Sequence, residues 1–259
     1  MDLQLNGKTA VVTGASRGIG LAITQALVRE GARVVAGART TSAELDSLVA
    51  GGDVQFVAVD LGRPEAAATL VDAAAGRIDV LVNNVGHAPA RTEGFLAITD
   101  EQWQQSLDLN LLSAVRILRS AVPVMIAGGG GSVVTVVSVN AVLPDPAVLD
   151  YGAAKAALAN ASKALSKELA PSRIRLNTVS PGPVSTALWL GAGGVAETFA
   201  AAGGATAQEV VDQAARQSPT GRFTTPDEVA DLVLLLASER SANVTGADFT
   251  VDGGLVPTW

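Results

Sequence analysis

The chain has 259 residues, of which 48% are hydrophobic and 17% are charged, and its net charge is −7. It contains no cysteine, one histidine (His87) and one tyrosine (Tyr151), which excludes cysteine nucleophiles, disulfides, iron–sulfur clusters and histidine-rich metal sites. With so few of these ligands, we expect no bound metal. The acidic balance argues against a nucleic-acid partner, because such a partner requires a basic surface.

The N-terminal residues 1–4 have neither the basic region nor the apolar region of a secretory signal. The densest apolar stretch, residues 232–237, is far shorter than the roughly 18–20 residues that span a bilayer. We therefore expect a cytoplasmic protein that does not contact a membrane.

Short β-branched runs alternate with segments of helical periodicity along the chain. Strands are expected at residues 9–12, 33–36, 54–59, 80–82, 132–137, 175–179 and 248–251, and helices at 19–30, 66–75, 100–127, 151–169 and 227–236. Continuous apolar strands are typical of parallel sheets that are covered on both faces. The pattern predicts an α/β fold with a single domain over residues 1–259. This domain is a Rossmann-type, doubly wound parallel sheet of about seven strands with helices on both faces.

A glycine-rich turn follows the first expected strand and precedes a helix. Its glycines, Gly14, Gly18 and Gly20, would allow a phosphate to approach the free N–H groups of that helix. The spacing differs from the usual dinucleotide fingerprint, so a purely structural turn stays possible. The second strand ends at Arg39 without a carboxylate, and arginine suits a 2′-phosphate better than a ribose hydroxyl. Arg39 and Arg17 therefore favour NADP(H) over NAD(H), unless both are ordinary solvated side chains.

Tyr151 and Lys155 lie one helical turn apart, which places the ammonium near the phenol. A nearby cation lowers a phenol pKa and suits it to acid–base chemistry on a carbonyl or alcohol. The pair alone also fits a core tyrosine beside a surface lysine. Ser138, at the end of an earlier strand, favours the catalytic interpretation because ligands bind at that edge of open α/β sheets.

Residues 190–204 are rich in glycine and alanine, which indicates a mobile segment with some helix near Glu197. Either a surface loop or a substrate lid fits this composition, and its position after the site favours a lid over about residues 187–217.

In order and spacing, these motifs resemble the compact type of the short-chain dehydrogenase/reductase family over nearly the whole chain, including its 3-oxoacyl reductases. The matching pieces are residues 13–20, Asp60, residues 83–86, Asn110, Ser138, Tyr151, Lys155, residues 181–182 and residues 245–254. The resemblance implies that Tyr151 exchanges a proton with the substrate oxygen and that Lys155 tunes Tyr151. It also implies that Ser138 polarises the carbonyl and that Asn110 anchors a proton-relay water.

The resemblance further implies the cofactor contacts. They are Gly14, Ser16, Arg17, Gly18, Ile19, Gly20, Arg39, Asp60, Leu61, Asn83, Val85, Gly86, Tyr151, Lys155, Pro181, Gly182, Val184 and Thr186. Candidate substrate contacts, mostly apolar, are Val139, Asn140, Leu143, Val148 and Trp189. Two departures stand out: Val85 replaces the family's common alanine, and Gly129 lacks the basic charge of carrier-protein-linked reductases. His87 is interpreted as a loop residue at the pocket, with general-base action as the alternative.

These expectations describe an NADP(H)-dependent oxidoreductase that acts on a carbonyl or alcohol carbon of a largely apolar, small to medium substrate. The alternatives are a non-catalytic NADP-binding regulator on the same fold, and a lyase or epimerase that reuses the Tyr–Lys chemistry. The family resemblance also implies a homotetramer or homodimer, assembled through the helices at 100–127 and 151–169.

Overall fold

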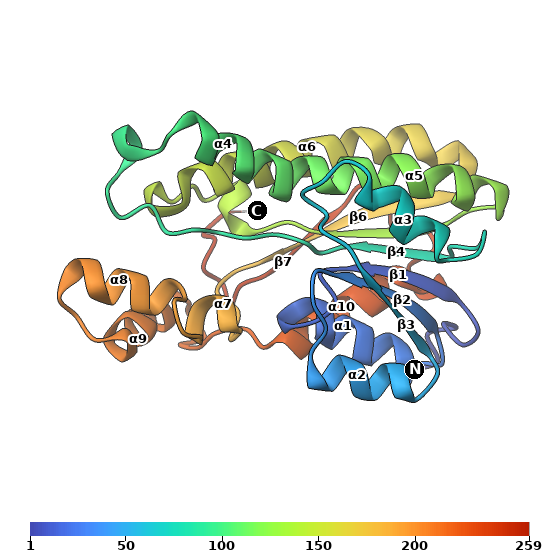
Figure 1. Cartoon of the computed structure of the whole chain (residues 1–259), viewed down its shortest axis with the longest axis horizontal. Coiled ribbons are helices and arrows are strands. Elements are labelled where there is room, and N and C mark those ends of the chain that lie inside the picture. Colours follow the sequence, from blue (N-terminus) through green and yellow to red (C-terminus); the bar gives the residue numbers. More distant parts are fainter. Residues whose placement is uncertain (259) are drawn as a thin grey trace.

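The computed structural model describes residues 1–258 and contains one seven-stranded sheet (Figure 1). The strand order is β3-β2-β1-β4-β5-β6-β7, and all neighbouring strands are parallel. The strands are β1 (Thr9–Thr13), β2 (Arg33–Ala38), β3 (Val54–Ala58), β4 (Val80–Asn83), β5 (Gly131–Val136), β6 (Ile174–Pro181) and β7 (Asp248–Val251). The expected doubly wound α/β architecture is confirmed, and all seven expected strands form.

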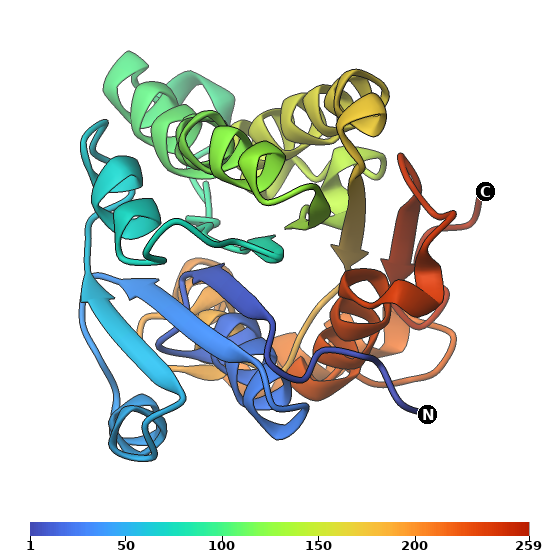
Figure 2. The ribbon, with the colours of Figure 1, turned by 90° about the vertical axis from the view of Figure 1, so that its right-hand side faces the viewer.

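Helices cover both faces of the sheet, as Figures 1 and 2 show. One face carries α1 (Gly18–Arg29), α2 (Ala43–Ala50) and α10 (Pro226–Ala237). The other carries α3 (Ala66–Asp72), α4 (Asp100–Leu107), α5 (Ser113–Ala127) and α6 (Leu149–Leu169). Alternate residues of β1 enter the two layers: Val12 packs in the core under α1 and α10, and Val11 packs in the core under α3 and α5.

Three further helices lie beside the main body: α7 (Ala187–Leu190), α8 (Val195–Gly203) and α9 (Ala207–Gln217) (Figure 1). The helix expected near Glu197 is present as α8. Helices α2 and α9 are not predicted from the sequence. In each of them a polar residue caps the first turn. Thr206 forms a capping box with Glu209, and Ser42 accepts a hydrogen bond from the Leu45 N–H.

The helix α3 is shorter than the predicted segment 66–75. It ends at Asp72, and the chain then turns through Ala75 (φ 51°) and Gly76 (φ 82°), both of which adopt a left-handed conformation. A helix cannot continue through such residues, so alanine periodicity alone overestimates its length.

Helices α4 and α5 form one helical stretch, joined by a π-helical turn over Asp108–Leu112. The stretch Asp100–Ala127 is the one helix within residues 1–258 that could cross a membrane by length and composition, with a mean hydropathy of 1.5 in an 18-residue window. No uninterrupted apolar run predicts it, because Arg116 and Arg119 interrupt the pattern. The expectation drawn from uninterrupted apolar runs is not contradicted, and this stretch packs against α3, α6 and the sheet.

Candidate active site

The carboxyl ends of β1, β4, β5 and β6 meet at one edge of the sheet. The chain moves outward in opposite directions from β1 and β4, so a crevice opens between these two strands at the point where open α/β sheets bind ligands. This edge carries Thr13, Asn83, Ser138 and Pro181, each at or just beyond a strand end.

The turn between β1 and α1 is suited to a phosphate. Gly14 and Gly18 adopt positive φ angles of 67° and 55°, and a Cβ atom at Gly20 would overlap the carbonyl oxygen of Gly14. No side chain caps the N-terminus of α1 and its first turn contains no acidic residue, so N–H groups there stay available to an anion. This cradle therefore fits the pyrophosphate of a dinucleotide, and Ser16 and Ile19 belong to the same turn.

Arg17 and Arg39 are both exposed, and neither forms an ion pair with another residue in the described part of the chain. Partial burial and the charges of Arg17, Arg39 and Arg91 lower the pKa of His87. Arg17 and Arg39 come from different loops, yet the charge of each lowers the pKa of His87. The two predicted phosphate ligands therefore lie in one electropositive neighbourhood.

The residues after β4 are held against β1. The Thr13 hydroxyl accepts hydrogen bonds from the N–H groups of Asn84 (2.9 Å) and Val85 (3.1 Å), and Asn84 Nδ2 donates to the Thr13 and Gly14 carbonyls. The Asn83 amide is buried and has no hydrogen-bond partner among residues 1–258. Asn84, predicted only as part of the segment 83–86, therefore positions the phosphate turn, whereas the Asn83 side chain makes no such bond.

The remaining predicted cofactor residues occupy three places around the crevice. Asp60 lies just beyond β3, partly exposed, with an oxygen 3.8 Å from Arg63, and Leu61 beside it is buried in the core. Past β6, Gly182 N–H donates to the Val251 carbonyl, and Val184 forms a bridge with Thr224. Thr186 approaches the phosphate turn, because its Cγ2 would lie 3.2 Å from a Cβ atom at Gly18.

Ser138, Tyr151 and Lys155 come together at the ends of β5 and α6. Lys155 is buried, with 2% of its surface exposed, and its Nζ lies 5.8 Å from the Tyr151 ring centroid while donating to the Val136 carbonyl at 2.9 Å. Burial lowers the pKa of Lys155 to about 8. Burial also raises the pKa of Tyr151, and a hydrogen bond with Ser138 acts in the opposite direction.

Burial therefore outweighs any lowering of the Tyr151 pKa by Lys155, contrary to the expectation. The physical reason is that both groups are desolvated, which favours the neutral form of each.

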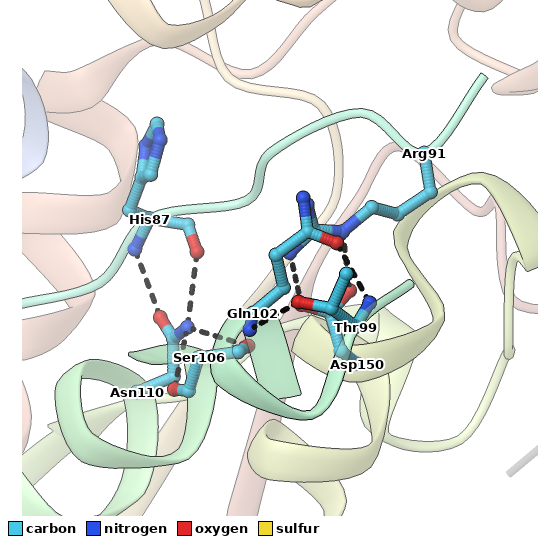
Figure 3. Close-up of polar contacts among 7 residues, drawn as sticks. All are labelled: His87, Arg91, Thr99, Gln102, Ser106, Asn110 and Asp150. Atoms are coloured by element: carbon cyan, nitrogen blue, oxygen red, sulfur yellow. Dashed lines mark hydrogen bonds and ion pairs between the residues drawn. The ribbon is translucent and has the colours of Figure 1, made fainter. Parts of the chain in front are cut away.

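Asn110 lies in the π-helical turn, a deviation that is frequent at functional sites. Its Oδ1 accepts the His87 N–H at 2.8 Å, and its Nδ2 donates to the His87 carbonyl at 3.0 Å (Figure 3). A Cβ atom at Gly86 would lie 3.1 Å from Asn110 Oδ1 and 3.2 Å from Lys155 Nζ. Gly86 thus permits Asn110 and Lys155 to approach the same point.

The predicted substrate contacts fall into two groups. In the first, Ser138 Oγ donates to Asn140 Oδ1 at 3.2 Å, and Asn140 Nδ2 donates to the Leu143 carbonyl at 3.2 Å. Val139 and Val148, also predicted contacts, are buried. In the second, Trp189 on α7 packs edge-on against Phe223, with ring centroids 5.1 Å apart.

Comparison with known proteins agrees with this geometry. A family model described as "Enoyl-(Acyl carrier protein) reductase" matches residues 14–256. The chain is 34% identical to a 3-oxoacyl-[acyl-carrier-protein] reductase of Thermotoga maritima, covering 98% of this chain and 100% of that protein. It is 37% identical to an L-xylulose reductase of Bos taurus, over the full length of both. It also resembles the crystal structure of an L-sorbose reductase from Gluconobacter frateurii complexed with NADPH and L-sorbose, with a TM-score of 0.91, 34% identity and full coverage of both chains.

Proposed function

Because the chain belongs to the short-chain dehydrogenase/reductase family of oxidoreductases, we propose that it transfers a hydride between NADP(H) and a carbonyl or alcohol carbon. The proposed substrate is a largely apolar, small to medium ketone or 3-oxoacyl compound. The observation that carries this proposal is the convergence of Ser138, Tyr151 and Lys155 at the sheet edge that also carries a glycine turn suited to a phosphate.

In the proposed reaction, bound NADPH supplies the hydride that adds to the carbonyl carbon. Tyr151 Oη donates its proton to the carbonyl oxygen, which leaves a phenolate and an alcohol, and the reverse reaction returns the proton to Tyr151. Ser138 Oγ binds the same oxygen and orients it. Lys155, still largely protonated at neutral pH with its pKa of about 8, stabilises the phenolate.

We assign the preference for NADP(H) over NAD(H) to Arg39, which follows β2, and to Arg17, which precedes α1. Arg39→Ala is expected to raise the KM for NADPH about 10- to 100-fold and to leave the KM for NADH unchanged, because a charge-assisted hydrogen bond to the 2′-phosphate is lost. Initial rates with each cofactor provide the measurement. Arg33→Ala, an exposed arginine at the opposite end of β2, is the matched control. Equal KM values for the two cofactors in the wild type would overturn the assignment.

A substrate panel tests the reaction itself. Leu143, Val148 and Trp189 favour apolar substrates, so ethyl acetoacetate and aryl ketones are expected to consume NADPH with a higher kcat/KM than L-sorbose or L-xylulose. The sugars belong in the panel because relatives carry the names of sugar reductases. If only the sugars are turned over, the proposed apolar substrate class is wrong and a sugar takes its place. If NADPH binds but no substrate is turned over, the alternative of a non-catalytic regulator is favoured.

The proposal also includes the segment over residues 187–217 as a substrate lid within a single-domain protein. The Trp189–Phe223 contact joins the first part of this segment to the chain that follows it, and the Val184–Thr224 bridge pairs the residues that flank it. We further expect a cytoplasmic homotetramer or homodimer assembled through α4, α5 and α6. On α5, Ile126 is 48% exposed, which is consistent with an apolar surface left for a partner subunit.

A further inference from the structure

A buried ion pair adjoins Tyr151, and none of the roles described so far includes it. Arg91 Nε donates to Asp150 Oδ1 at 3.1 Å and Arg91 Nη2 donates to Asp150 Oδ2 at 2.6 Å, which is a bidentate arrangement (Figure 3). The Asp150 side chain is 0% exposed and the Arg91 side chain is 12% exposed. Asp150 is the residue immediately before Tyr151, in the first turn of α6.

Arg91 belongs to the irregular segment that connects β4 to α4 across the site. This segment is held at Asn84 by β1, at His87 by Asn110, and at Arg91 by the start of α6. The Arg91 main chain adds a further contact, because its N–H donates to the Ala147 carbonyl at 2.7 Å. Arg91 therefore joins the segment that carries His87 to the helix that carries Tyr151. Long irregular segments of this kind in compact domains are usually functional.

The charge of Asp150 requires this partner. Burial is the largest single influence on Asp150 and would raise its pKa. The hydrogen bonds and charge of Arg91, together with hydrogen bonds from the Asp150 main chain and Ser106, outweigh it, and the pKa is lowered. Ser106 also accepts a hydrogen bond from Asn110 Nδ2 at 3.3 Å. Ser106 thus lies between the ion pair and Asn110, and Figure 3 shows the Ser106–Asn110 hydrogen bond beside the Arg91–Asp150 pair.

We propose that Arg91 is a positioning residue that neutralises the Asp150 carboxylate beside Tyr151 and fixes the His87 segment against the catalytic helix. The inference rests on the proposed function, in which Tyr151 carries the proton. An unpaired carboxylate at position 150 would disfavour the phenolate form of Tyr151, and an unpaired guanidinium at position 91 would favour it.

Other charged groups near Tyr151 come from each packed element. Lys155 lies on the same helix, 5.8 Å from the Tyr151 ring centroid, and the strand β5 leads to the uncharged Ser138. The segment after β4 carries Arg91 itself and the titratable His87, whose pKa Arg17 and Arg39 lower. Helix α4 presents Ser106 to Asp150, and Asp108 beyond it is paired with Arg116 at 2.7 Å. The variants below leave all these groups in place.

The test uses the fact that Tyr151 is the sole tyrosine of the chain. Its ionisation can be followed without any substrate, by the ultraviolet absorption of the phenolate or by the single Cζ resonance of protein labelled with ¹³C-tyrosine. Arg91→Gln is expected to raise the phenol titration midpoint by roughly half to one pH unit, and Asp150→Asn to lower it by a similar amount, as for a unit charge acting through protein interior. The double variant, which removes both charges, is expected to return close to the wild-type midpoint.

Activity provides a second readout. In ethyl acetoacetate reduction with NADPH, the rate falls above the pKa of the proton donor, so the alkaline limb is expected to move up in Arg91→Gln and down in Asp150→Asn. Arg91→Lys keeps the charge and loses the bidentate geometry, so it is expected to keep the midpoint within about 0.3 pH unit and to lower kcat. Arg77→Gln breaks a 2.9 Å pair with Asp79 at the opposite end of β4 and is expected to shift neither readout.

A merely structural ion pair would move both single variants in the same direction or shift neither, and either result would overturn the proposal. Circular dichroism identifies variants that fail to fold. If Arg91→Gln fails, Asp150→Asn must still shift the midpoint downward and Arg91→Lys must still preserve it. Failure of the proposed function looks different: Tyr151→Phe would then keep its turnover, whatever the phenol titration shows in the other variants.

Discussion

Tyr151→Phe is expected to lower kcat/KM for carbonyl reduction by about a hundredfold or more, with little change in the dissociation constant for NADPH. The substitution removes one hydroxyl, and general acid–base catalysis by a positioned side chain typically contributes 10²–10⁴-fold. Because the chain has no other tyrosine, no second phenol can substitute. Steady-state rates and NADPH fluorescence titration measure the two quantities.

Two measurements on the Tyr151→Phe variant itself serve as its controls. The tyrosinate absorption must disappear in the variant, which shows that the titrating phenol is Tyr151, and the thermal unfolding midpoint shows that the fold persists. Undiminished turnover in the folded variant would remove Tyr151 from the mechanism. It would also exclude the proton transfer on which the substrate proposal depends.

Gly20→Ala is expected to have the second-largest effect, through cofactor binding. The new Cβ would overlap the Gly14 carbonyl and contact the Asn84 amide, so the turn must shift. Overpacking of this kind typically costs about 1–3 kcal/mol in the free energy of unfolding. We expect the dissociation constant for NADPH to rise at least about tenfold, because the N–H groups of α1 and the turn move away from their positions around the phosphates.

Denaturant unfolding and fluorescence titration with NADPH provide the measurements for Gly20→Ala. The matched control is Gly203→Ala near the end of α8, where nothing lies within 4 Å of an added Cβ. The control is expected to bind NADPH as the wild type does. Equal affinity in Gly20→Ala and Gly203→Ala would show that the glycine turn does not hold the cofactor.

Local patterns predict most of the fold because each strand carries its own signal. The predicted strands are runs of three to six residues, most of them apolar and β-branched, and every one of them becomes a strand of the sheet. Helix ends are less predictable. Helix α3 stops at Asp72 because Ala75 and Gly76 adopt left-handed conformations, and no periodicity of alanines indicates that turn.

For the predicted catalytic side chains, too, sequence spacing predicts one property and the folded surroundings decide another. Tyr151 and Lys155 are neighbours through helical geometry, so sequence spacing is enough to pair them. Their protonation is a different matter, because it depends on how much water the surrounding chain excludes. Burial raises the pKa of Tyr151 and lowers that of Lys155, whereas spacing alone predicts only the attraction between ammonium and phenolate.

By itself, the sequence determined the α/β class and the strand positions, which follow from local periodicity, and it predicted the phosphate turn and the Ser138–Tyr151–Lys155 set. Only the tertiary structure decided which distant groups meet. Arg91 bonds Asp150 across 59 residues, Asn84 bonds Thr13 across 71, and Asn110 holds the backbone of His87 across 23. Such pairs have no sequence period, because they form where the right-handed crossovers bring the carboxyl ends of separate strands to one edge.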